Sequence, residues 1–131
     1  MLPEKDLVRL HHMYDAARET LGFATGHTRH DLDSDRMLLF ALVRGIEIIG
    51  EAAANVSAET RKAVPNVEWG RIVGMRNRLI HAYFTVNSSA VWGTVREDLA
   101  PLLAALKPYV GPADAEASPD RCHEADRPPS Q

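Results

Sequence analysis

The apolar positions of the chain recur at helical spacing from the N-terminus to about residue 110. Between Glu4 and Leu21 they stand three or four positions apart, and Gly22 and Gly26 then interrupt the pattern. We therefore predict a first helix over about residues 4–21. No stretch alternates between apolar and polar positions over the length of a strand, which argues against a β-sheet.

The second helix follows a polar linker that runs from Gly26 to Asp35. Its apolar run is MLLFALVRGIEIIGEAAANV, and either Asp33 or Ser34 can cap its start, since both side chains accept hydrogen bonds from backbone N–H groups. The polar connector SAETRKAVPN comes next, and its Pro65 prevents the helix from continuing.

Two more helices complete the pattern. The third is predicted from Val67 to about Phe84, and the fourth from Ser88 or Ser89 to Leu106, with a kink or local break at Pro101. Four helices joined by short connections predict an all-α fold, an antiparallel four-helix up-and-down bundle.

The last 21 residues differ from the rest of the chain. Residues 111–131 hold four of the eight prolines, five acidic and two basic residues, and no large apolar residue apart from Cys122. Such a composition cannot bury enough apolar surface to offset its ordering entropy, so we expect a disordered tail. Residues 1–110 then form the single folded domain, and they are formally neutral because the net charge of −3 belongs to the tail.

Composition narrows the cellular setting. A single cysteine excludes a disulfide framework and fits a reducing compartment. The charged N-terminal segment does not resemble a signal peptide, and the longest strongly apolar run, from Met37 to Val43, is far too short to cross a membrane. We therefore expect a cytoplasmic protein that spans no membrane. A neutral body also argues against coating DNA or other nucleic acid by bulk charge, although a local basic site stays compatible with it.

The third predicted helix carries an arginine among apolar positions. At 100° per residue, its apolar positions cover an arc of about 200°, wider than one core requires. Arg76 falls inside this arc, with Tyr83 beside it. A second copy of the chain is the simplest cover for so wide a face, which predicts a homodimer.

The second predicted helix carries a polar ridge along an apolar helix. Its members are spaced i, i+3, i+7 and i+11, and they are Arg44, Glu47, Glu51 and Asn55. Two interpretations stay open. Glu47 or Glu51 pairs with Arg76 and holds the bundle together, or these carboxylates support a functional site directly.

The segment RNRLIHAYF contains Arg76, His81 and Tyr83 in the pattern Arg-x4-His-x-Tyr. This pattern resembles the signature of HEPN ribonucleases of the HepT toxin type. The stretches IEIIGEAA, VPNVEWGRIVGMRN and VWGTVREDL are similar to the same family and stand in the same order, so the resemblance covers about residues 4–107. Ala82 departs from it, because glycine is more usual there.

The resemblance implies a metal-independent RNA endonuclease that acts as the toxin of a type VII-like toxin–antitoxin pair and needs no cofactor. In such proteins the arginine and histidine of two protomers meet in a cleft at the dimer interface. Arg76 and His81 would be catalytic, Asn77 would be a polar support, and Tyr83 would receive AMP from the partner antitoxin, a minimal nucleotidyltransferase.

These residue types suit the chemistry. The 2′-hydroxyl of RNA is itself the nucleophile, so cleavage to a 2′,3′-cyclic phosphate requires a proton carrier and a cation at the phosphate. Histidine, with an ordinary pKa of ~6.5, can act as general acid or general base, and arginine offers a planar set of donors to phosphate oxygens. The sequence does not decide which proton His81 transfers.

The spacing of the two residues raises a geometric question. Five positions correspond to about 140° on a straight helix, so Arg76 and His81 do not share a face. The helix loosens near Tyr83, or the long arginine reaches around, or two chains assemble the site, which is the option we prefer. The alternative function is a non-catalytic HEPN module that binds a nucleotide or docks the nucleotidyltransferase.

Four further histidines could suggest a metal site: His11, His12, His27 and His30. No acidic cluster in the sequence completes a ligand set with them, so we expect surface histidines and no bound metal.

Overall fold

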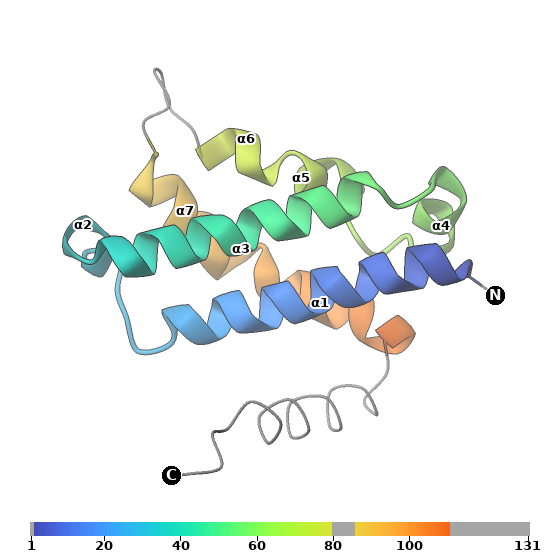
Figure 1. Ribbon diagram of the computed structural model, residues 1–131, viewed down its shortest axis with the longest axis horizontal. Coiled ribbons are helices and arrows are strands. Elements are labelled where there is room, and N and C mark those ends of the chain that lie inside the picture. Colours follow the sequence, from blue (N-terminus) through green and yellow to red (C-terminus); the bar gives the residue numbers. More distant parts are fainter. Residues whose placement is uncertain (1, 80–85, 111–131) are drawn as a thin grey trace, which may run out of the picture.

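The computed structural model describes residues 2–79 and 86–110 (Figure 1). Its helices are, in chain order, α1 (Glu4–Ala24), α2 (Asp31–Ser34), α3 (Arg36–Ala54), α4 (Ala58–Ala63), α5 (Trp69–Val73), α6 (Met75–Leu79) and α7 (Ser88–Glu97), and residues 99–110 are also helical. This part of the chain forms no β-strand, so the predicted all-α fold is confirmed. The expected disordered tail lies outside the described residues.

Four helical segments, which we call legs, run alternately in opposite directions along the bundle (Figure 1). The first two are α1 and α3, the third is α5 followed by α6, and the fourth is α7 followed by residues 99–110. α1 and α3 lie side by side over most of their length, and α5 and α6 pack along the other flank of α3. The up-and-down order predicted from the sequence is therefore present, with two of the four legs interrupted.

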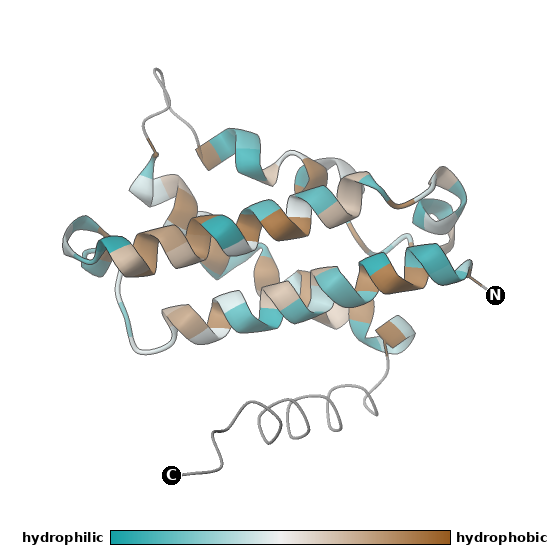
Figure 2. Ribbon diagram, in the orientation of Figure 1, coloured by the Kyte–Doolittle hydropathy of each residue, from teal (hydrophilic) through white to brown (hydrophobic). Residues whose placement is uncertain are grey.

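The core lies between the four legs and follows the helical spacing of the apolar residues. Figure 2 shows how hydrophobic and hydrophilic positions alternate around α3. Leu42, Ile46 and Ile49 are completely buried on that helix. The first and fourth legs also contribute completely buried apolar side chains, which are Leu10, Met13, Ala17, Val91, Val95, Leu99 and Leu106.

α1 and α3 approach each other closely where a glycine meets a threonine. A Cβ atom added to Gly45 would overlap with Oγ1 of Thr20 and would lie 3.0 Å from its Cβ. The Thr20 hydroxyl is buried and donates to the Ala16 carbonyl at 2.6 Å. The absence of a side chain at position 45 therefore sets the distance between the two helices.

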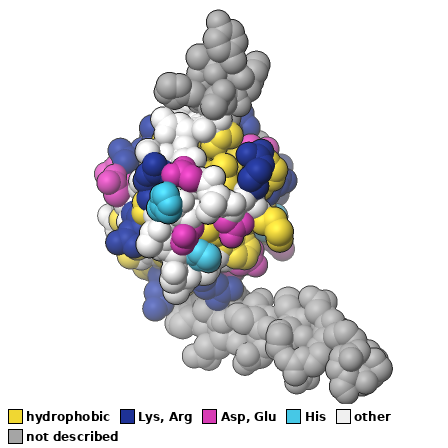
Figure 3. All heavy atoms as spheres, turned by 90° about the vertical axis from the view of Figure 1, so that its left-hand side faces the viewer, with side chains coloured by type: hydrophobic (Ala, Val, Ile, Leu, Met, Phe, Trp, Pro, Cys, Tyr) yellow, Lys and Arg dark blue, Asp and Glu magenta, His cyan; other side chains and the backbone are white. Residues whose placement is uncertain are grey.

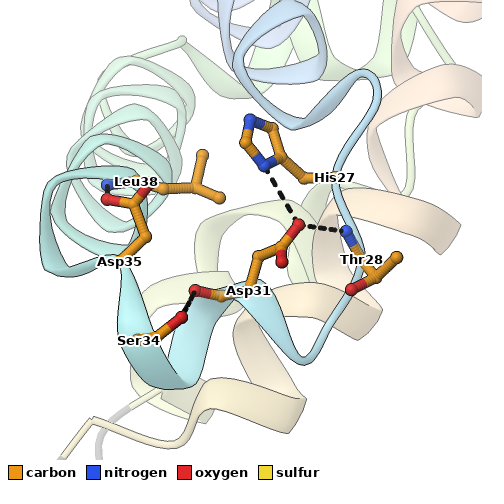
Figure 4. A network of polar contacts seen from close by, with 6 residues as sticks. All are labelled: His27, Thr28, Asp31, Ser34, Asp35 and Leu38. Atoms are coloured by element: carbon orange, nitrogen blue, oxygen red, sulfur yellow. Dashed lines mark hydrogen bonds and ion pairs between the residues drawn. The ribbon is translucent and has the colours of Figure 1, made fainter.

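The start of α3 corrects a prediction. Its N-cap is Asp35, whose carboxylate accepts from the Leu38 N–H at 3.0 Å, and not Asp33 or Ser34 (Figure 4). The reason is that residues 31–34 form the short helix α2 inside the predicted linker. Asp31 stabilises the preceding turn. Its carboxylate accepts from the Thr28 N–H at 2.9 Å and contacts His27 Nδ1 at 3.1 Å.

The third predicted helix is not continuous. It breaks at Gly74, between α5 and α6. The Gly74 N–H still donates to the Gly70 carbonyl at 3.1 Å, but the next turn begins afresh at Met75. Glycine weakens a helix interior because it loses the most backbone freedom on folding, which explains a break at this position.

This break changes the argument made from the apolar arc. On a helix broken at Gly74, the angles of a straight helix no longer apply across the whole segment. The core-facing side chains Ile72, Met75 and Leu79 are all at most 4% exposed within one chain. In the described part of this leg, these apolar side chains are already buried by the same chain. The apolar arc by itself therefore does not require a second copy of the chain.

The fourth leg breaks at Asp98, three residues before the proline that was expected to cause the kink. Pro101 lies in the first turn of helical residues 99–110, where a missing N–H is tolerated. The helix also passes Pro108 and continues to residue 110, the last described residue, beyond the predicted end at Leu106.

The connector after α3 is anchored by a buried carboxylate of α1. Asp6 is 4% exposed and accepts from the hydroxyl of Ser57 at 2.6 Å, from the hydroxyl of Thr60 at 2.5 Å and from the N–H of Ser57 at 3.2 Å. Ser57 is also the N-cap of α4. These hydrogen bonds, led by the one from the Ser57 hydroxyl, lower the pKa of Asp6 below its ordinary value.

Candidate functional site

Arg76 is the second residue of α6, with its side chain 55% exposed. Its Nη1 atom is 3.9 Å from Oε2 of Glu51, whose side chain is 53% exposed on α3. An ion pair this long and this open to water stabilises a protein little, since the two charges are well solvated. The guanidinium is therefore accessible to an external anion, with a carboxylate beside it.

This placement resolves part of the question about the two glutamates. Glu51 is the carboxylate near Arg76, whereas Glu47 pairs with Arg44 at 3.4 Å. The expectation that Arg76 sits in an apolar environment is wrong, because its side chain is open to solvent while Met75 and Leu79 form the buried face of α6. Asn77, the predicted polar support, follows Arg76 and is also exposed.

The other two arginines of this leg are bound to a single buried carboxylate. Asp98, whose side chain is 5% exposed, contacts Nε of Arg71 at 2.8 Å and Nη2 of Arg78 at 2.9 Å. Arg78 also donates from Nη1 to the Arg71 carbonyl at 3.1 Å. The Asp98 carboxylate raises the pKa of Arg71 through its hydrogen bond and charge.

The three arginines of α5 and α6 have different partners. Arg71 and Arg78 bind Asp98, and we call these three residues the Asp98 clamp. Two guanidinium groups hold the third leg to the break in the fourth leg, and Arg76 points instead toward α3. Because charged hydrogen bonds are short and strong, the clamp fixes the direction of α6 and thereby the position of Arg76.

His81 and Tyr83, the other predicted site residues, lie outside the described residues. The structure describes the residues on both sides of them. The Asn87 N–H donates to the Leu79 carbonyl at 2.7 Å, so the end of α6 and the start of α7 lie next to each other. Asn87 also caps α7, since its side-chain oxygen accepts from the Ala90 N–H at 3.0 Å.

Sequence reasoning missed two buried aspartates, although a signal for each was present. Asp98 falls in the apolar series Val91, Val95, Leu102, and Asp6 falls four positions before Leu10 in the apolar series of α1. A carboxylate at a core position requires hydrogen-bond partners, so each aspartate predicts a buried polar contact. The sequence does not say which residues are the partners.

Within residues 2–79 and 86–110, no group of three or more histidine, cysteine, aspartate or glutamate side chains is arranged to hold a metal ion. His27 contacts Asp31, and His30 Nδ1 lies 3.7 Å from Asp33. At the α2 end of the molecule, basic, acidic and histidine side chains are mixed (Figure 3).

None of the described helices combines the length and the apolar character that crossing a membrane requires.

Comparison with known proteins adds independent information. The family model described as "Ribonuclease HepT-like" matches residues 13–109. The chain is 33% identical over 90 residues to "Putative RNase MJ1380" of Methanocaldococcus jannaschii, covering 69% of this chain and 83% of that protein. It is 40% identical over 72 residues to "Probable ribonuclease HepT" of Thermococcus cleftensis, covering 55% and 66% respectively.

A third relative, "Putative RNase TTE0752" of Caldanaerobacter subterraneus subsp. tengcongensis, is 36% identical over 98 residues, or 75% of this chain and 88% of that protein. No solved structure matches the chain significantly. The matched region runs from α1 to the last helix and includes Arg76, the Asp98 clamp and the segment with His81. The chain belongs to the HepT-like ribonuclease family.

Proposed function

We propose that this protein is a metal-independent RNA endonuclease in which Arg76 and His81 act on the scissile phosphodiester. The observation that carries the proposal is the solvent-exposed Arg76 guanidinium at 55% exposure, on the short helix that leads directly into the segment containing His81. Membership of a ribonuclease family supports it.

The proposed reaction needs only groups of the chain and of the RNA. The 2′-hydroxyl attacks the adjacent phosphorus, its proton leaves to a base, and the 5′-oxygen departs with a proton from an acid, which leaves a 2′,3′-cyclic phosphate. His81 supplies one of these proton transfers. Arg76 stabilises the negative charge that accumulates on the phosphate oxygens. Glu51, 3.9 Å from the guanidinium, and Asn77, the next residue of α6, are its proposed polar supports.

The experiment compares cleavage of an end-labelled RNA by the full chain and by Arg76→Ala and His81→Ala, with EDTA present. Each variant is expected to lose at least about a hundredfold in rate, since general acid–base catalysis contributes ~10²–10⁴-fold. Arg96→Gln, which removes an exposed cation of α7, serves as control and should cleave normally. A wild-type chain that is harmless on expression and cuts no RNA would instead favour the docking or nucleotide-binding module.

The same proposal includes a partner and its mode of control. A minimal nucleotidyltransferase antitoxin would attach AMP to Tyr83, and the added negative charge and bulk would compete with RNA phosphate for Arg76. Tyr83→Phe should therefore cleave RNA but resist neutralisation by the partner with ATP. Equal silencing of wild type and Tyr83→Phe would contradict this mode of control.

The proposal also includes a homodimer with its two sites near the seam. Met37 and Phe40 are 84% and 55% exposed at the start of α3. Their helical spacing continues through Arg44 to Glu51, which contacts Arg76. An exposed apolar pair in line with the proposed site supports a second copy of the chain on this face of α3.

A further inference from the structure

A groove of about 490 Å³ lies between α1 and the second half of α3. Its cationic side chains are Lys5, Arg9 and Arg44, and His12 also lines it. Glu51 is its one acidic residue. The domain as a whole is formally neutral, so this groove concentrates positive charge that the average does not reveal.

The cations of the groove are largely unused by the fold. Lys5, Arg9 and His12 form no ion pair or hydrogen bond within the described part of the chain, although the charge of Arg9 helps to lower the pKa of Asp6, and Arg44 contacts Glu47 at 3.4 Å. Lys5, Arg9 and His12 are spaced i, i+4 and i+7, so they form one stripe along α1. At 1.5 Å per residue, this stripe extends over about 10 Å.

A second groove of the molecule has the opposite charge. It is lined by Arg71 together with Glu68, Glu97 and Asp98, beside the third and fourth legs. A polyanion would be repelled from it, so the two grooves distinguish two sides of the bundle. Next to Lys5 and Arg9, the surface also turns acidic through Glu4 and Glu59, which limits the basic stretch.

The basic groove is continuous with the proposed active site. Glu51 lines the groove and also approaches Arg76 at 3.9 Å, so one side chain separates the groove from the guanidinium. We infer that the groove between α1 and α3 binds the phosphate backbone of the RNA next to the scissile bond, with Lys5 and Arg9 contacting phosphates. This inference rests on the proposed function and extends it to substrate binding along α1.

The test is the salt dependence of binding to a 20-nucleotide RNA with 2′-O-methyl groups, which lacks the nucleophile and cannot be cleaved. Fluorescence anisotropy measures Kd between 50 and 200 mM KCl. Lys5→Gln/Arg9→Gln should weaken binding about tenfold at 100 mM and reduce the slope of log K against log[KCl] by about 1.4, from two phosphate contacts. Lys5→Arg/Arg9→Lys should restore both values.

A matched pair, Arg96→Gln/Lys107→Gln, removes two exposed cations that do not line the groove and should change neither value by more than about twofold. If the groove pair binds like the control pair while Arg76→Ala abolishes cleavage, the inference about the groove is wrong and the proposed function stands. If the wild type neither binds nor cuts RNA, both are wrong. Thermal unfolding of each variant verifies that it is folded.

Discussion

Individual charged residues of this protein divide into those that hold the fold and those that stay available to a ligand. Asp98 and Asp6 are buried and satisfied by hydrogen bonds from the chain. Arg76 and Lys5 are exposed, Arg9 is half-buried, and all three carry weak contacts or none. Arg71 and Arg78 are also exposed but are hydrogen-bonded to buried Asp98, so a short bond to a buried carboxylate, and not burial of the cation itself, distinguishes the structural arginines from the candidate binding groups.

Asp6 makes stability depend on pH. Because its pKa is lowered in the folded state, its carboxylate stabilises the fold above the unfolded value near 3.8, and this contribution is lost as the pH falls through the folded pKa. Asp6→Asn should lower the free energy of unfolding at pH 7 by about 1–3 kcal/mol. Urea unfolding at pH 7 and pH 3 should show the difference between variant and wild type shrinking at the lower pH.

The control for this prediction is Glu19→Gln, which neutralises an exposed acid on the same helix. It should leave the free energy of unfolding within about 0.5 kcal/mol at either pH. A wild-type advantage over Asp6→Asn that stays constant down to pH 3 would contradict a role for the charged carboxylate.

At the scale of helices, the sequence predicted the existence of the four legs well and their interruptions poorly. The apolar spacing identified α1 and α3 to within a few residues, because long periodic segments leave little ambiguity. Gly74 is a local signal for the break between α5 and α6, which the apolar spacing overrode, whereas the break at Asp98 coincides with contacts between legs, the Asp98 clamp, that no local pattern encodes. The capping residue was misplaced because α2 occupies residues that read as a polar linker.

The same limit applies to the candidate site. The resemblance selected Arg76, but the wheel of a straight helix placed it in an apolar environment, whereas the structure exposes its side chain. Glu51 was one of two candidate partners, and the structure distinguishes it from Glu47. His81 and Tyr83 stay predictions, as they fall outside the described residues.

The contact between α1 and α3 predicts a strong effect of a single methyl group. Gly45→Ala should lower the free energy of unfolding by about 1–3 kcal/mol, because its Cβ would overlap the buried Thr20 hydroxyl. Adding Thr20→Ala should recover part of the loss, since it removes the overlapping atoms. A double-mutant cycle by urea unfolding measures the coupling between the two positions, and additive effects would contradict a direct clash.

The Asp98 clamp predicts a local effect on α6. Asp98→Asn removes the charge shared by Arg71 and Arg78 and should cost about 1–3 kcal/mol of stability. Amide hydrogen exchange should accelerate in α5 and α6 more than in α1, and RNA cleavage should fall because Arg76 loses its fixed direction. Glu97→Gln, at the neighbouring exposed position, is the control and should leave exchange in α6 unchanged.

At the scale of the whole molecule, charge and apolar surface are organised around α3. The basic groove lies on its α1 side, Arg76 approaches it from α6, and Met37 and Phe40 are exposed near its start. A bundle that is neutral overall thus presents to solvent one helix with a cationic groove, a cation and an apolar pair close to it. This arrangement is compatible with a site shared between two protomers.

Sedimentation equilibrium tests the dimer. The wild type should behave as twice 14.5 kDa at micromolar concentrations. Met37→Asp should shift it toward the monomer and reduce RNA cleavage, because a charge on an apolar contact opposes association. Phe23→Asp, which alters an exposed hydrophobic residue at the end of α1, should stay dimeric. A wild-type monomer that still cuts RNA would contradict the shared site.

The hydrogen bond from the Asn87 N–H to the Leu79 carbonyl is independent of the side chains proposed for catalysis. The bond is made by main-chain groups, so it holds Leu79 and Asn87 together whichever side chains stand between them in the sequence. Substitutions of the proposed site residues His81 and Tyr83 therefore leave this constraint in place. A loss of cleavage in such variants would then report the missing side chain and not a displaced α7.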